Sequence, residues 1–146
     1  MALDEQVSQK LITGQLRSIT DASARANLLP ETNGLGFATG AGAAVTQITN
    51  RSTGVTINAF CGKITTDTTS LAALAIATFT VTNSKVAIGD VISVSKRSGF
   101  TNTKTDVRVT AVAAGSFDIS IHNIDASTAE IGAGIINFIV HKAVSA

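Results

Sequence analysis

The chain has 146 residues, of which 45% are hydrophobic and 14% are charged, and its formal net charge is +1 at pH 7. This length suits one domain with an added arm or tail, and the near-neutral charge predicts no binding to nucleic acid or to an anionic membrane surface. The aromatic residues are six Phe, with no Trp or Tyr, which counts against base-stacking and sugar-binding sites. The single cysteine, Cys61, excludes an internal disulfide, so packing alone has to hold the fold together.

The first 34 residues differ in composition from the rest of the chain, and they contain the only proline, Pro30. Their apolar side chains recur at helical spacing in two overlapping rows, which predicts an amphipathic helix. The rows are Leu3, Val7 and Leu11, followed by Ile12, Leu16 and Ile19. Asp4 can cap this helix, whereas Gly14 weakens it by about 1 kcal/mol relative to alanine. Three interpretations stay open: a short helix packed on its own domain, an arm that folds on a neighbouring subunit, or a disordered segment.

We therefore divide the chain into an N-terminal arm and linker, residues 1–34, and a β-sandwich domain, residues 35–146. The start of the chain is polar and acidic rather than basic and then apolar, so we expect no secretory signal. No apolar run reaches the roughly 18 residues that cross a bilayer. The sequence thus predicts a protein that is made in a cytoplasm and has no membrane partner.

From residue 44 onward the chain alternates between apolar residues and threonine or serine, which is the period of a half-buried β-strand. In the clearest run, residues 77–82, Ala77, Phe79 and Val81 form one face and three threonines form the other. Turn signals separate eight such runs, which predicts an all-β fold, an antiparallel β-sandwich of jelly-roll type. The predicted strands are residues 44–49, 54–59, 63–66, 76–83, 90–96, 106–113, 116–122 and 135–142. Residues 70–75 are rich in helix formers and predict one or two helical turns.

One hairpin is specified in detail by residues 106–113 and 116–122. We expect Val107, Val109 and Ala111 to face the core from the first strand. We expect Phe117, Ile119 and Ile121 to do so from the second strand, with Gly115 in the tight turn. A slip of one residue would expose these three large side chains at roughly 1.5–3 kcal/mol each, so the core sets the register.

Few residues offer chemistry. Catalysis needs a base or nucleophile with an orienting partner, and the two histidines, His122 and His141, fall near strand ends on the polar face. Neither has a Cys or Glu at metal-ligand spacing, so we interpret both as surface or interface residues. Cys61 is interpreted as a small buried hydrophobe rather than a reactive thiol. We therefore expect no catalytic residues, no metal site, no cofactor and no enzymatic activity.

Three short motifs are interpreted as chance matches or surface features. The glycines of residues 34–40 have the wrong spacing and no flanking strand and helix for a dinucleotide loop. Asn50, Arg51 and Ser52 match a glycosylation sequon, but without a secretory signal they are interpreted as a turn. Lys96 and Arg97 form a lone basic pair, which we expect to be solvated.

The 20 threonines invite two interpretations. Branched, uncharged residues suit a pleated surface, so β-propensity alone can account for them. Exposed strands with few charges are, however, weakly protected against association. We therefore favour a symmetric oligomer.

Two stretches carry a likeness to known proteins. The first comprises residues 40–47 (GAGAAVTQ) and 51–58 (RSTGVTIN), and the second comprises residues 112–119 (VAAGSFDI), 122–124 (HNI) and 136–143 (INFIVHKA). In these strand-and-turn patterns the chain resembles a group of tailed-phage virion structural proteins, over roughly residues 36–146. It departs from them at Ala43, where relatives often have glycine, and residues 1–34 match nothing in the group.

The resemblance implies a compact β-domain of the virion, and some proteins of this group decorate or cement the capsid. We expect a capsid decoration or cement protein on the outer surface of the shell, with the major capsid protein and further copies of itself, as a homotrimer, as partners. The expected interface residues lie in the arm: Leu3, Val7, Leu11, Ile12 and Leu16. The first alternative is a tail-associated structural module, such as a fibre, tip or adaptor. The second is a host- or glycan-binding module.

Overall fold

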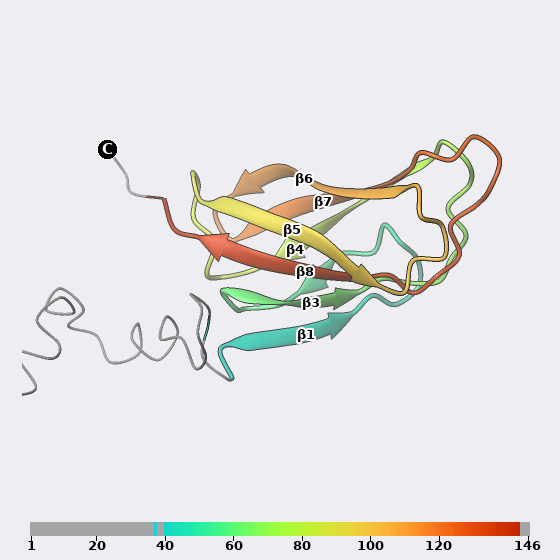
Figure 1. Cartoon of the computed structure of the whole chain (residues 1–146). Coiled ribbons are helices and arrows are strands. Elements are labelled where there is room, and N and C mark those ends of the chain that lie inside the picture. Colours follow the sequence, from blue (N-terminus) through green and yellow to red (C-terminus); the bar gives the residue numbers. More distant parts are fainter. Residues whose placement is uncertain (1–36, 38–39, 144–146) are drawn as a thin grey trace, which may run out of the picture. The chain divides into compact units, whose positions relative to one another are not determined.

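The computed structural model describes residue 37 and residues 40–143 (Figure 1). In this part of the chain there are eight strands and no helix. The strands are β1 (Gly42–Thr46), β2 (Val55–Thr56), β3 (Cys61–Thr65), β4 (Ile76–Thr82), β5 (Val91–Ser98), β6 (Thr105–Ala113), β7 (Ser116–Asn123) and β8 (Ile135–His141). All eight predicted strands are present with shifted ends, although the one predicted over residues 54–59 is reduced to the two residues of β2. The predictions for residues 1–34, including the helix and its five interface residues, fall outside the described residues.

The strands form two mixed sheets of four, which lie as two layers in Figure 1. The first sheet has the order β1-β3-β8-β5 and the second has the order β2-β4-β7-β6. The pairs β1–β3 and β2–β4 are parallel, so the prediction of a purely antiparallel arrangement is wrong for them. The cause is that the chain crosses to the other sheet at each of its first three connections and reverses direction each time. Strands two apart in sequence therefore return to the same sheet in the same direction.

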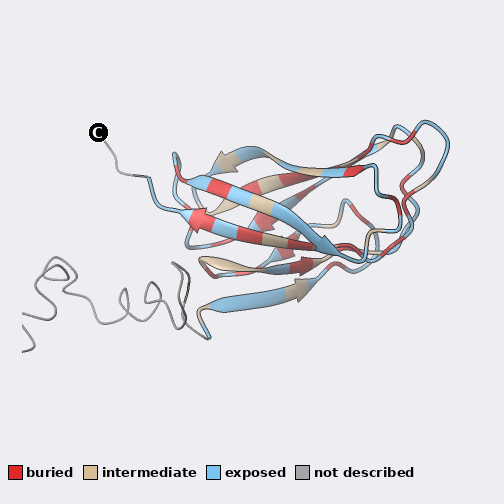
Figure 2. Cartoon of the chain, in the orientation of Figure 1, coloured by how far each residue is buried: buried red, intermediate tan, exposed pale blue. Residues whose placement is uncertain are grey.

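A single apolar core lies between the sheets. Along β4 the side chains alternate between buried and exposed, and Ala77, Phe79 and Val81 face inward as predicted. Figure 2 shows the same alternation as bands along β5 and β8. The inner faces meet at Phe117 of β7 and Phe138 of β8, whose ring centroids are 5.6 Å apart. The arrangement is thus sandwich-like, and no described helix is long and apolar enough to cross a membrane.

The β6–β7 hairpin has the predicted register for most of its length. Phe117, Ile119 and Ile121 are fully buried, and Gly115 occupies the turn with a φ of 79°. A β-bulge leaves Thr110 without a partner, because Val109 pairs with Ile119 and the next pair joins Ala111 to Asp118. The bulge reverses the alternation beyond it, so Val112 packs against the core in place of Ala111. The prediction for Ala111 is therefore wrong.

The predicted helical turns at residues 70–75 are also wrong. Leu71 instead forms an isolated antiparallel bridge with Glu130, and residues 72–75 form a turn closed by the Ala75 N–H on the Ala72 carbonyl at 3.1 Å. The side-chain amide of Asn123 donates to the carbonyls of Leu71 and Ala72. These tertiary hydrogen bonds take the groups that a helix would use, and six residues are too few to nucleate a helix on their own.

A substitution at Gly62 tests how closely β1 packs beside β3 in the first sheet. A Cβ atom there would lie 2.4 Å from the Ala43 carbonyl oxygen and 3.1 Å from atoms of Ile57 and Phe138. We expect Gly62→Ala to lower the free energy of unfolding by about 1–3 kcal/mol, because backbone has to move. Gly42→Ala is the control, since its Cβ would have neighbours only at 3.4 Å and beyond. Equal urea midpoints by circular dichroism for the two variants would contradict this close packing.

Candidate interaction surfaces

One end of the domain gathers four loops, which we call the loop end: residues 47–54, 66–75, 99–104 and 124–134 (right side of Figure 1). Its sequence contains five charged residues, Arg51, Asp67, Lys104, Asp125 and Glu130. Arg51, Asp125 and Glu130 are buried. These buried charges are where chemistry would be sought first.

Glu130 is fully buried, and its carboxylate accepts five hydrogen bonds. Oε1 accepts the N–H and hydroxyl of Thr101 and the N–H of Gly132, at 2.7–2.9 Å. Oε2 accepts the N–H of Asn102 and the hydroxyl of Thr105 at 2.8 and 2.9 Å. Burial by itself raises the pKa of the Glu130 carboxyl, but the backbone N–H donors outweigh it and lower the pKa from 4.5 to about 2. The side chain is therefore a carboxylate at neutral pH, and it joins the β5–β6 and β7–β8 loops.

Arg51 extends this connection to two further loops. Its guanidinium donates to the carbonyls of Thr69 at 2.6 Å and Gly132 at 2.8 Å, and to the hydroxyl of Thr66 at 3.2 Å. Burial lowers the pKa of Arg51, while the nearby carboxylates of Glu130 and Asp67 act in the opposite direction. The planar fork of an arginine suits this task, because it reaches several carbonyls from one position.

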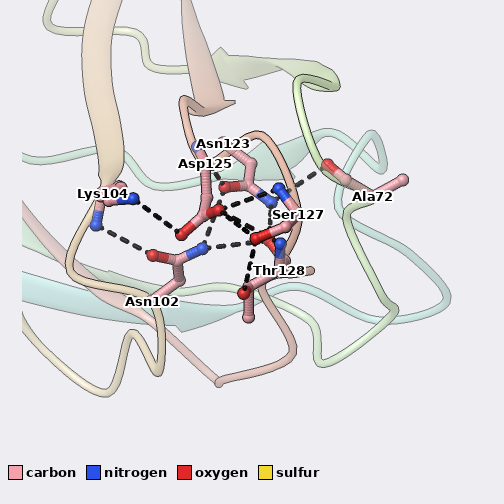
Figure 3. Close-up of polar contacts among 7 residues, drawn as sticks. All are labelled: Ala72, Asn102, Lys104, Asn123, Asp125, Ser127 and Thr128. Carbon is pink, nitrogen blue, oxygen red and sulfur yellow. Dashed lines mark hydrogen bonds and ion pairs between the residues drawn. The ribbon is translucent and has the colours of Figure 1, made fainter.

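Figure 3 shows a second group of polar residues at the loop end. It is linked to Glu130 through Asn102, whose N–H donates to the Glu130 carboxylate. The amide of Asn102 donates to the Asn123 side-chain oxygen at 3.1 Å, and both amides donate to the Thr128 carbonyl. Asp125 accepts the N–H groups of Ser127 and Thr128, and its other oxygen lies 3.4 Å from the Lys104 ammonium. The N–H of Ser127 is the largest cause that lowers the pKa of Asp125 to about 2, against the effect of burial.

The network at the loop end is complete within itself. In the described part of the chain, every buried side-chain nitrogen or oxygen has a hydrogen-bond partner. Among the same residues, no group of three or more His, Cys, Asp or Glu is placed to hold a metal ion. The arrangement therefore fixes loops in place rather than presenting free groups to a ligand.

The outer face of the first sheet carries very little charge. Its strand registers place two rows side by side: Ser93, Ile139, Cys61 and Gly42, then Ser95, Asn137, Lys63 and Ala44. Lys63 is the one charged side chain in these rows. Most of the others are small or apolar, so these two rows form a nearly uncharged patch of the outer face.

The outer face of the second sheet contains the predicted row of threonines. The hydroxyls of this row bond across the sheet, with Thr78 2.7 Å from Ser120 and Thr80 donating to Asp118 at 2.7 Å. Asp118 is joined on this face by the charged side chain of Arg108, which lies opposite Ser120 on β6. The threonines of this sheet are thus partly engaged within the domain and lie beside charges.

The structure also places the histidines, the cysteine and the basic pair that the sequence analysis considered. His122 is half-buried in β7 and His141 is exposed at the end of β8, so the two histidines lie in different sheets. Cys61 is half-buried, and burial raises the pKa of its thiol. The prediction of a solvated basic pair is confirmed, because Lys96 and Arg97 are both exposed. The Lys96 ammonium also donates to the carbonyl of Thr105 and lies 5.8 Å from the Phe100 ring centroid.

Sequence reasoning missed the buried network. The sequence predicts Arg51 only as part of the turn at residues 50–52, and nothing in that motif indicates a buried guanidinium. One signal was readable: Asp125 followed two residues later by Ser127 is an Asx-turn pattern, and the same spacing joins Asn50 to Ser52.

Comparison of the chain with protein-family models, curated proteins and solved structures found no match.

Proposed function

We propose that this chain is a virion structural protein of a tailed phage, a decoration or cement protein that binds the outer capsid surface and stabilises the shell. The observation that carries the proposal is the outer face of the first sheet, where Lys63 is the one charged side chain in two rows. Soluble surfaces usually intersperse both signs of charge, so a patch of strand rows with one charge favours coverage by a neighbouring protein. The resemblance to phage virion proteins supports the same role.

The proposed mechanism is cross-linking. The partners are the major capsid protein and further copies of this chain, arranged as a homotrimer at three-fold positions of the shell. A rigid oligomer that contacts several capsid subunits stabilises the shell through many small interfaces acting together. The hydrogen-bonded loop end supports this role, because it keeps the domain rigid without a disulfide.

Two finer parts of the proposal concern the architecture. Eight strands in two four-stranded sheets are compatible with a jelly-roll sandwich, although the parallel pairs β1–β3 and β2–β4 depart from a purely antiparallel one. The N-terminal residues act as an arm in which Leu3, Val7, Leu11, Ile12 and Leu16 are apolar anchors. Burial of these side chains on a partner would contribute several kcal/mol, on the order of 1.5–3 kcal/mol each before the ordering cost.

Substitution of the arm in the full-length chain tests this contact. We expect Leu3, Val7 and Leu11 changed together to serine to abolish co-sedimentation with capsids, because the anchors are lost, while the urea midpoint of the β-domain stays unchanged. Ile88→Ser is the control, since Ile88 is an 80% exposed aliphatic residue outside the arm. Undiminished capsid binding by the triple variant would refute the role of the arm.

The abundance of the protein in particles separates this function from a tail-associated module. A decoration protein repeats over the shell and is present in hundreds of copies, whereas a fibre, tip or adaptor is present in few. Gel densitometry of purified particles, scaled to the major capsid protein, measures the number. A count of a dozen or fewer would favour the tail.

A further inference from the structure

We propose that the outer edge of β1 is an interface at which two copies of this chain join by strand pairing. β1 lies at one edge of the first sheet, and no strand in the described part of the chain pairs with its outer side (Figure 1). An edge strand presents a row of backbone N–H and C=O groups that can bind the extended backbone of another strand. The inference goes beyond the proposed function and does not depend on it.

β1 lacks the features that protect the other three edge strands of the two sheets. β2 is only two residues long. β5 has a register shift near its end and carries the exposed charges of Lys96 and Arg97. β6 has the bulge at Thr110 and the exposed charges of Asp106 and Arg108. β1 instead has five residues in regular register with β3, and its sequence, GAAVT, contains no charge and no proline. Among the described edges, β1 is therefore the one open to pairing.

The backbone groups on the outer side of β1 belong to Gly42, Ala44 and Thr46. The N–H of Gln47 donates to the Thr65 carbonyl of β3 at 2.8 Å, which fixes the direction of the ladder. Successive residues of a strand point their backbone groups to opposite sides, so the odd-numbered residues of β1 bond to β3 and the even-numbered ones face outward.

This outward set is symmetric about Ala44, so a second copy related by a two-fold axis can satisfy it. An antiparallel partner centred there would place the two Ala44 residues opposite each other and Gly42 opposite Thr46. Each such pair exchanges two backbone hydrogen bonds. The side chains that meet at the axis are small and neutral, so no bulk or like charge opposes the approach.

The occupant is a second copy rather than a flexible peptide segment. The β1 strand of a second copy is already extended and paired with its own β3, so pairing orders little backbone, whereas a flexible segment would lose conformational entropy. The two nearly uncharged rows of the first sheet also run up to β1 and end at Gly42 and Ala44. Pairing would therefore join the patches of the two copies into one continuous surface.

The charge in these rows does not oppose this contact. Lys63 lies on β3, one strand away from the edge of β1. Three strand spacings would then separate the Lys63 residues of the two copies, which is about 14 Å. This distance exceeds the screening length of roughly 8 Å at physiological ionic strength, so their repulsion is weak.

The mass of the full-length chain in solution tests the inference. A short strand on each side supplies less than a standard interface, so sedimentation equilibrium has to cover micromolar to millimolar concentrations. We expect the mass to double as the concentration rises, whether the smaller unit is a monomer or a trimer. Ala44→Lys would place two ammonium groups opposite each other at the axis, and it should raise the concentration of half-dissociation at least about tenfold. Ser95→Lys is the matched control, because Ser95 is exposed in the same row at the β5 edge.

A pair of proline variants tests the direction of the backbone groups. Ala44→Pro removes an N–H that faces outward, so we expect the urea midpoint to stay within error of the wild type while the doubling of mass is lost. Ala43→Pro removes an N–H that faces β3, so we expect it to lower the urea midpoint. Equal urea midpoints for the two variants would contradict the assigned direction.

The result that overturns the inference is a wild-type mass that does not double at any concentration. Ala44→Lys and Ala44→Pro variants that pair as readily as the wild type and Ser95→Lys would also overturn it. No capsid takes part in these measurements. A failure of the wild type to bind shells therefore refutes the decoration function alone and leaves the strand pairing in place.

Discussion

Glu130→Gln is expected to lower the free energy of unfolding by at least about 3 kcal/mol at pH 7. Each carboxylate oxygen of Glu130 accepts a backbone N–H, from Thr101 and Gly132 on Oε1 and from Asn102 on Oε2. The NH₂ group of glutamine would face an N–H donor in either orientation. A buried donor without an acceptor costs about 1–3 kcal/mol, and the charge-assisted hydrogen bonds are lost as well.

The lowered pKa of Glu130 corresponds to a stabilisation of the same order, since it has the same hydrogen bonds as its cause. The Glu130 carboxyl has a pKa of about 2 in the folded chain and 4.5 in the unfolded chain. This difference stabilises the folded state by about 3 kcal/mol. Because the folded pKa is the lower one, this stability is fully present above pH 4.5 and is lost as the pH falls toward 2. Glu130→Gln should therefore flatten the fall in stability of the wild type between about pH 5 and pH 2.

Urea unfolding across this pH range measures both effects, and far-UV circular dichroism is the probe because the chain has no Trp or Tyr. Asp106→Asn is the matched control, since it makes the same acid-to-amide change at an exposed position of β6. We expect the control to stay within about 0.5 kcal/mol of the wild type. A Glu130→Gln variant as stable as this control would show that the five hydrogen bonds do not stabilise the fold.

Arg51→Met is expected to have the second large effect, a loss of about 3–5 kcal/mol. The methionine keeps much of the apolar volume but leaves the carbonyls of Thr69 and Gly132 without their donor. It also removes the positive charge that lies near the buried Glu130. The loops β1–β2, β3–β4 and β7–β8 would lose the one side chain that joins all three.

A double-mutant cycle distinguishes a shared network from two separate sites. If Arg51 and Glu130 belong to one network, the double variant Arg51→Met, Glu130→Gln should lose less stability than the sum of the single variants. Arg108→Met, at an exposed position of β6, controls for the loss of a guanidinium. Additive losses within about 0.5 kcal/mol would contradict the coupling.

The strands were predictable from the sequence because their signals are local. Alternation and turn residues mark β4 and the β6–β7 hairpin wherever the rest of the chain lies. The parallel pairs β1–β3 and β2–β4 were not predictable, because they depend on which strands meet after the chain crosses between the sheets. The bulge at Thr110 and the turn at Leu74 likewise depend on tertiary contacts, with Ile119 and Asp118 in one case and Asp125 in the other.

The candidate surfaces were predictable only in outline. A shortage of charge is visible in composition, but its placement on the outer face of the first sheet follows from the register of β3, β5 and β8. The burial of Arg51 and Glu130 arises from residues 79 positions apart in the chain. No local pattern in either loop indicates its partner.

The position of β8 has a consequence for how the chain acquires its structure. The last of the described strands, β8, lies in the middle of the first sheet, between β3 and β5. During synthesis, β3 and β5 therefore emerge long before the strand that joins them, and the β6–β7 hairpin is the one pairing of consecutive strands. The nearly uncharged sheet face cannot exist until the C-terminal strand has been made.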